Sequence, residues 1–251
     1  MAPSQSSVAI ILRSRAYGES DEIVTFLTAD VGKLTGIAKG AKNSRRRFAN
    51  CLGPFTRVRV HFRSRLGASL VFMESCDLLL PPGALIEPRK FAYASYLVEL
   101  VDQLTAEGQP VPELYGLLSE GLEALQQGSA TAALLRTFEL RVLECAGYGP
   151  QLHTCAVCQR SVLAAGQAFL DSTHGSIWCA ACRRSDQSAI PVTGITLAAL
   201  DATRGTSLAD VRASAFPRAA ASEAAQLMGR LLALHLPRPM RSIKLIAALS
   251  Q

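Results

Sequence analysis

The sequence changes its hydrophobic periodicity once, at Pro81-Pro82-Gly83, and this change constrains the fold more than any other feature. Before it, short β-branched and apolar segments alternate with clusters of turn-forming residues, a pattern typical of strands. After it, apolar residues recur with a helical period. The sequence therefore predicts an α+β protein with a β domain at residues 1–80 and an all-helical domain at residues 81–251.

Five strands are expected in the first domain, at residues 7–16, 22–28, 33–38, 55–63 and 69–76, with a turn at 66–68 before the last. Five strands leave exposed edges unless the sheet closes on itself, and the OB-fold, a five-stranded Greek-key barrel, is a common solution at this size. The β domain is therefore predicted to be an OB-fold barrel. Such barrels bind oligonucleotides on one face and in the flanking loops.

Positive charge gathers between Lys33 and Arg63, a stretch without any Asp or Glu. Its first part, residues 39–47, is expected to form an exposed, mobile connection between strands. The strand after it alternates strictly, which predicts one basic face and one apolar face. The predicted nucleic-acid contacts are Lys33, Lys39, Lys42, Arg45, Arg46, Arg47, Arg57, Arg59 and Arg63. The alternative is that these residues form only a solvated strand face and a solvated loop.

The charge balance favours a nucleic-acid partner. Residues 1–80 hold twelve Lys and Arg against six Asp and Glu, and the remaining residues hold fourteen of each kind, so the whole net charge of +6 belongs to the first domain. An anionic membrane would attract the same charge, but the domain has no basic amphipathic helix to lie in an interface. No apolar run approaches the about 18–20 residues that span a bilayer. The N-terminus lacks the basic region of a signal peptide, so we expect a cytoplasmic protein.

Helices are expected in the second domain at residues 89–105, 113–127 and 130–146, where they form a bundle, and again at 193–203, 219–236 and 241–249. Residues 204–217 look irregular. Residues 151–192 break the helical pattern and contain four of the seven cysteines. We therefore expect an inserted module at about 151–192.

The four cysteines of this module have the spacing of a two-knuckle zinc site, with pairs at Cys155–Cys158 and Cys179–Cys182. Two tight turns of this kind bring four thiolates around one tetrahedral ion, and a shell of four thiolates leaves no position for a reactive water. The sequence predicts one structural zinc ion. A redox-active cysteine pair is the alternative, and His153 or His174 lies close enough in sequence to replace a ligand.

Sequence motifs of common enzyme classes are absent: there is no GxxxxGK[ST], GxGxxG, GxSxG or HExxH. We therefore expect a protein that is not an enzyme. Three alternatives stay open: an RNA- or ribosome-associated protein built from the same parts, a nuclease that uses the acidic pair Asp21–Glu22, and a scaffold whose helical half matters most.

The sequence resembles the bacterial RecO family of recombination mediators. The resemblance runs in order from about residue 8 to residue 244, through 18–24 (GESDEIV), 32–34 with 38–41, 54–55, 93–102 (YASYLVELVD), 138–140 with 147–148, and the two cysteine pairs. It implies an N-terminal OB-fold, a helical domain and a zinc-binding insertion. It also implies DNA contact through the basic strand and loop.

What the resemblance implies about function goes further. RecO proteins bind single- and double-stranded DNA, anneal complementary strands and act with RecR. They help to load the RecA recombinase onto DNA coated by the single-stranded-DNA-binding protein (SSB), and in some species they contact its C-terminal tail. A family member is expected near the nucleoid in the cytoplasm. Some members lack the four cysteines, so the zinc site is not expected to be essential to the shared activity.

Overall fold

The structure is a computed structural model, and it describes residues 3–64, 70–164, 166–171, 173–183, 189–213, 216 and 218–249. The predicted turn at 66–68 and the start of the predicted strand at residue 69 lie outside these residues. The chain forms two compact units. The first comprises Met1–Gln127 and Met240–Gln251, and the second comprises Gly128–Pro239.

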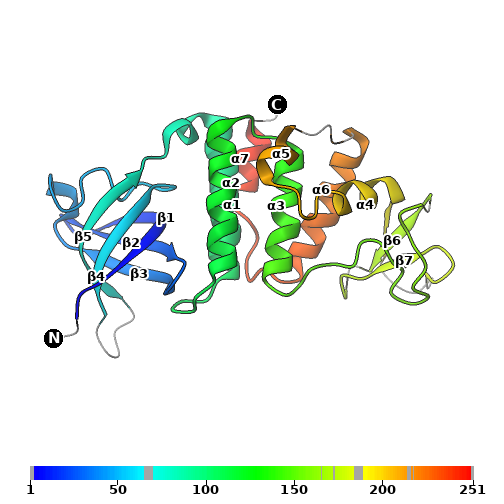
Figure 1. The fold of residues 1–251 in the computed structure, drawn as a ribbon, viewed down its shortest axis with the longest axis horizontal. Coiled ribbons are helices and arrows are strands. Elements are labelled where there is room, and N and C mark those ends of the chain that lie inside the picture. The colour runs from blue at the N-terminus through cyan, green and yellow to red at the C-terminus, as the bar shows by residue number, and fades with distance from the viewer. Residues whose placement is uncertain are drawn as a thin grey trace. The chain divides into compact units, whose positions relative to one another are not determined.

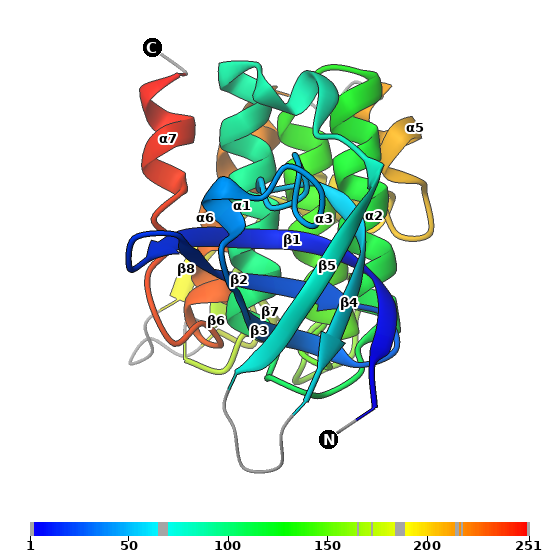
Figure 2. The same ribbon diagram turned by 90° about the vertical axis from the view of Figure 1, so that its left-hand side faces the viewer.

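Five strands of the first unit close into a barrel with the order β1-β2-β3-β5-β4 (Figure 2). They are β1 (Gln5–Tyr17), β2 (Asp21–Thr28), β3 (Gly32–Ala38), β4 (Arg57–Arg63) and β5 (Val71–Leu80). All neighbouring strands are antiparallel except β3 and β5, and β1 pairs with both β2 and β4 to complete the closure. The predicted OB-like barrel is confirmed.

Strict alternation builds the barrel core. In β4, Val58, Val60 and Phe62 are fully buried, while the residues between them are at least partly exposed. Phe62 meets Phe26 of β2 edge to face, with 6.1 Å between ring centroids. Buried aromatic and β-branched side chains of this kind supply most of the apolar area that stabilises a small barrel.

Three helices pack within the same unit: α1 (Pro88–Leu104), α2 (Pro112–Gln127) and α7 (Ile243–Ala248), after a short 3-10 turn, η2 (Gly83–Ile86) (Figure 1). A proline begins both α1 and α2, where its missing N–H has no helical partner to lose. Phe91 of α1 lies edge to face with Phe55 of the barrel, 5.3 Å between centroids. Contacts like this one place the boundary between the compact units at Gln127–Gly128, whereas the change of periodicity predicts a domain boundary at 80–81.

The second unit contains α3 (Ala132–Cys145), α4 (Gly194–Asp201), α5 (Leu208–Ala213) and α6 (Arg218–Ala233). It also contains a three-stranded antiparallel sheet of β6 (Ala168–Asp171), β7 (Ile177–Cys179) and β8 (Ala189–Val192), in the order β7-β6-β8. Helix α3 packs on α5 and α6. One expectation needs correction, because α5 lies in the stretch predicted to be irregular. Of the three helices predicted to form a bundle, α1 and α2 belong to the first compact unit and α3 to the second.

The helix α5 is short, and its only long apolar side chains, Leu208 and Val211, are both buried. Two apolar residues give too weak a periodic signal to be recognised in a sequence. Among the described helices, none combines the length and the apolar composition needed to cross a bilayer.

Candidate nucleic-acid interface and metal centre

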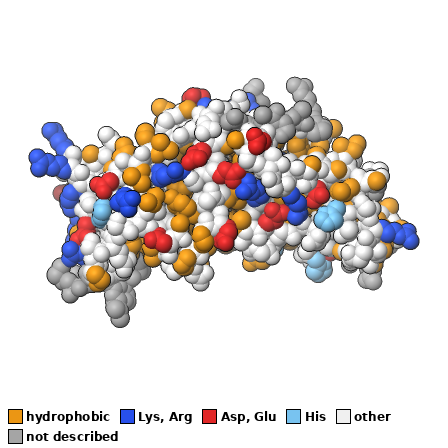
Figure 3. Space-filling model, viewed as in Figure 1, with side chains coloured by type: hydrophobic (Ala, Val, Ile, Leu, Met, Phe, Trp, Pro, Cys, Tyr) orange, Lys and Arg blue, Asp and Glu red, His pale blue; other side chains and the backbone are white. Residues whose placement is uncertain are grey.

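Five cations lie together on the connection between β3 and β4. We call this set the basic loop: Lys39, Lys42, Arg45, Arg46 and Arg47. All five side chains are exposed, and no carboxylate of the described chain lies within ion-pair distance of any of them. In the space-filling view, Lys and Arg side chains protrude from the barrel (Figure 3). The basic loop therefore presents uncompensated positive charge to solvent.

The basic loop is anchored. The connection that carries it sends Phe48, Cys51 and Leu52 into the barrel core. The backbone carbonyl of Arg47 accepts a hydrogen bond of 2.8 Å from the N–H of Cys76 in β5. The expected exposure of the basic loop is confirmed, and the buried residues that follow it attach the connection to the barrel.

Two of the loop cations also stabilise the loop. The Lys42 ammonium donates to the backbone carbonyls of Gly18 and Glu19, each at 3.0 Å. The Arg47 guanidinium donates to the carbonyl of Lys39 at 2.9 Å. Because carbonyl oxygens carry no net charge, these bonds position the cations without neutralising them.

The predicted cations on the strands differ from those of the loop because most of them form ion pairs within the chain. Lys33 pairs with Asp102 of α1 at 2.9 Å, and Arg57 pairs with Glu123 of α2 at 2.6 Å. Arg63 pairs with Glu74 of β5 at 2.7 Å. Arg59 is exposed and lies opposite Asp77 in the register of β4 and β5. The structure therefore brings five of the nine predicted residues together and gives three others an intramolecular carboxylate.

The pairing of Lys33 and Arg57 with these carboxylates could not be predicted from the sequence. Asp102 and Glu123 lie 69 and 66 residues from their partners, on helices assigned to the other predicted domain. The basic face of β4 was correctly predicted from its alternation. The charge of that face is lowered by groups that only the tertiary fold brings to it.

A shallow hollow on the outer surface of the barrel has a volume of about 70 Å³. Its walls are Arg13, Ser14, Arg15, Ile23, Thr25 and Thr35. None of these residues belongs to the predicted contacts, because residues 7–16 were interpreted only as an apolar strand. The signal that marks them is the Arg-Ser-Arg alternation at the end of β1.

The metal centre lies in the second unit and contains all four predicted ligands. The sulfur atoms of Cys155, Cys158, Cys179 and Cys182 all lie within 4.8 Å of one another. The Sγ atoms of Cys158 and Cys179 are 3.8 Å apart. A tetrahedral ion with metal–sulfur bonds of about 2.3 Å holds its sulfurs about 3.8 Å apart, so the donor set fits such an ion.

Local structure brings the two cysteine pairs together. Cys155 and Cys158 occupy a tight turn in which the N–H of Gln159 donates to the Cys155 carbonyl at 2.9 Å. Cys179 ends strand β7, and the N–H of Cys182 donates back to its carbonyl at 3.1 Å. The N–H of Ala156 donates to the carbonyl of Ile177 at 2.8 Å and ties the first turn to β7.

The pKa values of two thiols in this cluster are shifted in opposite directions. Burial raises the pKa of the Cys155 thiol, but hydrogen bonds from the N–H groups of Cys158, Cys179 and Val157 outweigh burial and lower that pKa to about 6. Hydrogen bonds to the sulfurs of Cys179 and Cys158 raise the pKa of Cys182 to about 12. Four crowded sulfurs cannot all ionise alone, and a bound cation removes this conflict.

The two histidines near the module have other partners. His174 lies 2.7 Å from the carboxylate of Asp171, and His153 lies 3.4 Å from that of Asp201. The four cysteines are the only group of three or more metal-type ligands found in the described part of the chain. The acidic pair of the nuclease alternative also has partners within the chain. Asp21 accepts a hydrogen bond from the N–H of Gly40, and Glu22 accepts one from the hydroxyl of Ser14.

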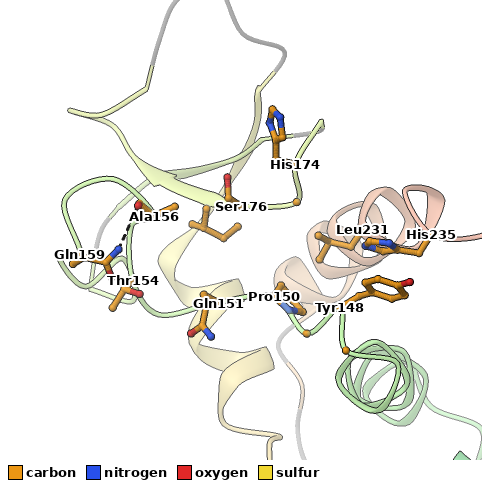
Figure 4. Close-up of a pocket in the computed structure, with 14 residues that line it drawn as sticks. Tyr148, Pro150, Gln151, Thr154, Ala156, Gln159, His174, Ser176, Leu231 and His235 are labelled. Carbon is orange, nitrogen blue, oxygen red and sulfur yellow. Dashed lines mark hydrogen bonds between the residues drawn. The ribbon is translucent and has the colours of Figure 1, made fainter.

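A larger hollow of about 490 Å³ lies beside the metal module (Figure 4). Tyr148 and His235 stack at its rim, with 3.9 Å between ring centroids. Gln151, Ser176 and Leu231 contribute to its walls. Among the described residues that line the hollow there is no Lys, Arg, Asp or Glu, so these residues offer no strong charge to a ligand.

Comparison with known proteins gives consistent matches. Residues 1–81 match the family described as "Recombination protein O N terminal", and residues 87–244 match "Recombination protein O C terminal". A protein of Anaeromyxobacter sp. (strain K) named "DNA repair protein RecO" is 37% identical over 230 residues, which cover 91% of this chain and 90% of that protein. Proteins with the same name from Geobacter metallireducens and Myxococcus xanthus are 37% and 36% identical and cover at least 95% of both chains.

Proposed function

This chain belongs to the RecO family, and on that premise we propose that it is a DNA repair and recombination mediator whose barrel binds DNA without cleaving it. The observation that carries this proposal is the basic loop, whose five exposed cations have no carboxylate partner in the described chain. Lys and Arg side chains that reach backbone phosphates bind DNA with little regard to sequence. Both single and double strands are therefore ligands of this surface.

Strand annealing follows from the same surface. Two complementary strands repel each other through their phosphates, and a cationic loop that contacts both lowers this repulsion. Because phosphate contacts leave base edges free, the bound strands can still pair. No step of this mechanism makes or breaks a covalent bond, so we propose that the protein is not an enzyme.

Family membership supports the remaining assignments. RecR is a proposed partner, with which the protein helps to load the RecA recombinase onto SSB-coated DNA. The C-terminal tail of SSB is a further proposed partner. The metal is zinc, which suits a closed shell of four thiolates and acts structurally. Cys155, Cys158, Cys179 and Cys182 hold it. The protein works in the cytoplasm at the nucleoid, where thiols stay reduced.

Salt-titrated equilibrium binding tests the proposal. For single strands, each neutralised phosphate contributes a slope of roughly −0.7 to the logarithm of affinity against that of salt, so the five cations of the basic loop predict a slope of about −3.5 or steeper. Affinity should therefore fall by about 100-fold or more between 50 and 200 mM salt. A slope near zero would contradict the proposal.

Two further assays separate the alternatives. In a competition assay, structured RNA should not displace single-stranded DNA when both are present at equal nucleotide concentration. Preferential binding of RNA would support the RNA-associated alternative instead. End-labelled DNA incubated with Mg²⁺ should stay intact, and its cleavage would support a nuclease.

A further inference from the structure

The outward-facing residues of β1 change from buried and apolar to exposed and mostly basic along the strand. Ile10 is buried, with 1% of its surface exposed, and lies before an irregularity of register between Ile11 and Arg13. The pairing with β2 then continues without a shift to Tyr17. Because alternate residues of a strand share a face, Arg13, Arg15 and Tyr17 lie on one face of β1. We call these three residues the β1 track.

The β1 track lies outside the barrel. Val24 and Phe26 of β2 belong to the barrel core, so the residue between them, Thr25, points outward. Thr25 is the partner of Arg13 in the register of β1 and β2. The track therefore faces away from the core, on the surface where β1, β2 and β3 lie side by side (Figure 2). Helix α1 and the residues after it cover part of this surface, since Thr25 is only 3% exposed and Lys33 and Thr35 contact Asp102 and Glu107. The three residues of the track are themselves exposed.

Polar groups surround the first part of the track. Arg13, Thr25 and Thr35 lie in register across β1, β2 and β3, and the hydroxyls of the two threonines are 3.4 Å apart. Together with Ser14 and Arg15 they border the hollow of about 70 Å³. Thr25 is buried and the Thr35 hydroxyl donates to Glu107, so the groups free to bind a ligand here are the two guanidiniums. Guanidinium groups match the oxygens of a phosphodiester, which accept several hydrogen bonds at once.

The carboxylates on this surface are Asp102, Glu107 and Asp21, the last opposite Tyr17 in the register, and they leave the two arginines of the track only partly compensated. Arg13 is 62% exposed and lies 3.7 Å from Asp102, a carboxylate that already pairs with Lys33 at 2.9 Å. One negative charge thus serves two cations. Arg15 is exposed, and no carboxylate of the described chain lies within ion-pair distance of it. The nearby Glu107 accepts a hydrogen bond from Thr35.

An exposed aromatic ring ends the track. Tyr17 is 55% exposed and is followed by the turn at Gly18 and Glu19, whose carbonyls hold the ammonium of Lys42. The track therefore leads directly to the basic loop. An aromatic ring beside cations is the arrangement that proteins use for single strands, because unpaired bases stack on the ring while cations hold the phosphates.

We propose that the β1 track is a single-strand binding site, in which Arg13 and Arg15 bind phosphodiester groups and the ring of Tyr17 stacks on an unpaired base. This inference rests on the proposed function and deepens it. The basic loop binds phosphates of either DNA form, whereas the track selects unpaired DNA, since the bases of a duplex are not free to stack on Tyr17. The track thus keeps one strand aligned beside the loop.

Equilibrium binding by variants of the full chain tests the track. Tyr17→Ala should weaken binding of oligo(dT) by about fivefold or more, with the salt slope unchanged and duplex affinity altered less than twofold. Tyr17→Phe keeps the ring and should bind as wild type does. Arg13→Ala with Arg15→Ala should reduce the single-strand salt slope by about 1.4, and the double lysine variant should restore it. Equal losses for single strands and duplex in Tyr17→Ala would overturn the proposal.

Photochemical crosslinking gives an independent readout. An oligonucleotide that contains 5-bromodeoxyuridine, irradiated in complex with the protein, should form an adduct on the peptide that contains Tyr17, identified by mass spectrometry. The adduct should persist in Tyr17→Phe and disappear in Tyr17→Ala. Adducts found only elsewhere on the chain would overturn the assignment of Tyr17.

The same experiments separate failure of the track from failure of the proposed function. If the track variants bind oligo(dT) as wild type does while loss of Arg45, Arg46 and Arg47 weakens binding, the track proposal is wrong and the DNA-binding function stands. If neither set of variants affects binding and the salt slope is near zero, both proposals are wrong. Far-ultraviolet circular dichroism of each variant confirms that the barrel is folded.

Discussion

The ammonium of Lys33 lies 2.9 Å from Oδ1 of Asp102, and it also donates to the backbone carbonyl of Asp102 at 2.5 Å. Both side chains are largely buried, with 12% and 15% of their surfaces exposed. The pair joins strand β3 to helix α1. The charge of Lys33 is thus compensated within the chain, which distinguishes it from the basic loop.

Lys33→Ala should therefore affect stability and not DNA binding. Removing Lys33 leaves the mostly buried Asp102 with only its longer contact of 3.7 Å to the exposed Arg13, so we expect the free energy of unfolding to fall by about 1–2 kcal/mol. Affinity for DNA should stay within about twofold of wild type. Urea denaturation and oligonucleotide binding measure the two effects. The matched control, Lys39→Ala, should leave stability unchanged and weaken binding; the reverse pattern would contradict the assignment.

Replacing Arg45, Arg46 and Arg47 together by alanine should weaken DNA binding without unfolding the barrel, because all three side chains are exposed. Three lost phosphate contacts should reduce the single-strand salt slope by about 2. The matched control removes three exposed cations from elsewhere, Arg160, Arg230 and Lys244. If the control variant loses as much affinity as the loop variant, net charge and not the loop is responsible.

Metal removal should destabilise the second unit and spare the barrel. Structural zinc couples directly to folding, so chelation, or Cys155→Ser with Cys158→Ser, should lower the unfolding midpoint by about 10 °C or more. Cys145→Ser, outside the cluster, is the control and should keep one zinc per chain. Metal analysis, thermal unfolding and salt-titrated DNA binding give the three readouts. An unchanged midpoint in a metal-free sample would count against a structural role.

Glu99 should make stability depend on pH. Burial raises the pKa of this carboxyl, but it accepts hydrogen bonds from the N–H groups of Arg241 and Ser242 and from the Ser242 hydroxyl, and these lower its pKa below the ordinary 4.5. A carboxyl whose pKa is lower in the folded than in the unfolded chain stabilises the fold above that ordinary value. The contribution is lost as pH falls through the lowered pKa.

The contrast between wild type and Glu99→Ala measures this contribution. At pH 7 the variant should lose about 1–2 kcal/mol of unfolding free energy, comparable to a helix cap. The difference should shrink as pH falls below the ordinary pKa of 4.5 and through the lowered one. A difference that stays constant between pH 7 and pH 3 would show that the carboxylate form is not what holds the segment before α7.

Much of the fold follows from local patterns. The alternation in β4 places Val58 and Val60 inside the barrel, and proline at the start of α1 and α2 marks where each helix begins. The two cysteine pairs also converge as their spacing predicts. These features depend on residues that are near one another in sequence, so local sequence patterns are enough to predict them.

Features that depend on distant residues were not predictable in this way. The ion pair of Arg57 with Glu123 requires knowing that α2 packs on the barrel. Periodicity alone gives no such information.

Annealing of complementary oligonucleotides tests the central claim most directly. Wild-type protein and the variant that lacks Arg45, Arg46 and Arg47 are compared at 50 and 200 mM salt, with annealed product measured over time. If the basic loop neutralises two strands at once, wild type should accelerate annealing at 50 mM salt and much less at 200 mM, and the variant should do little at either. Annealing by the variant at the wild-type rate would contradict the account.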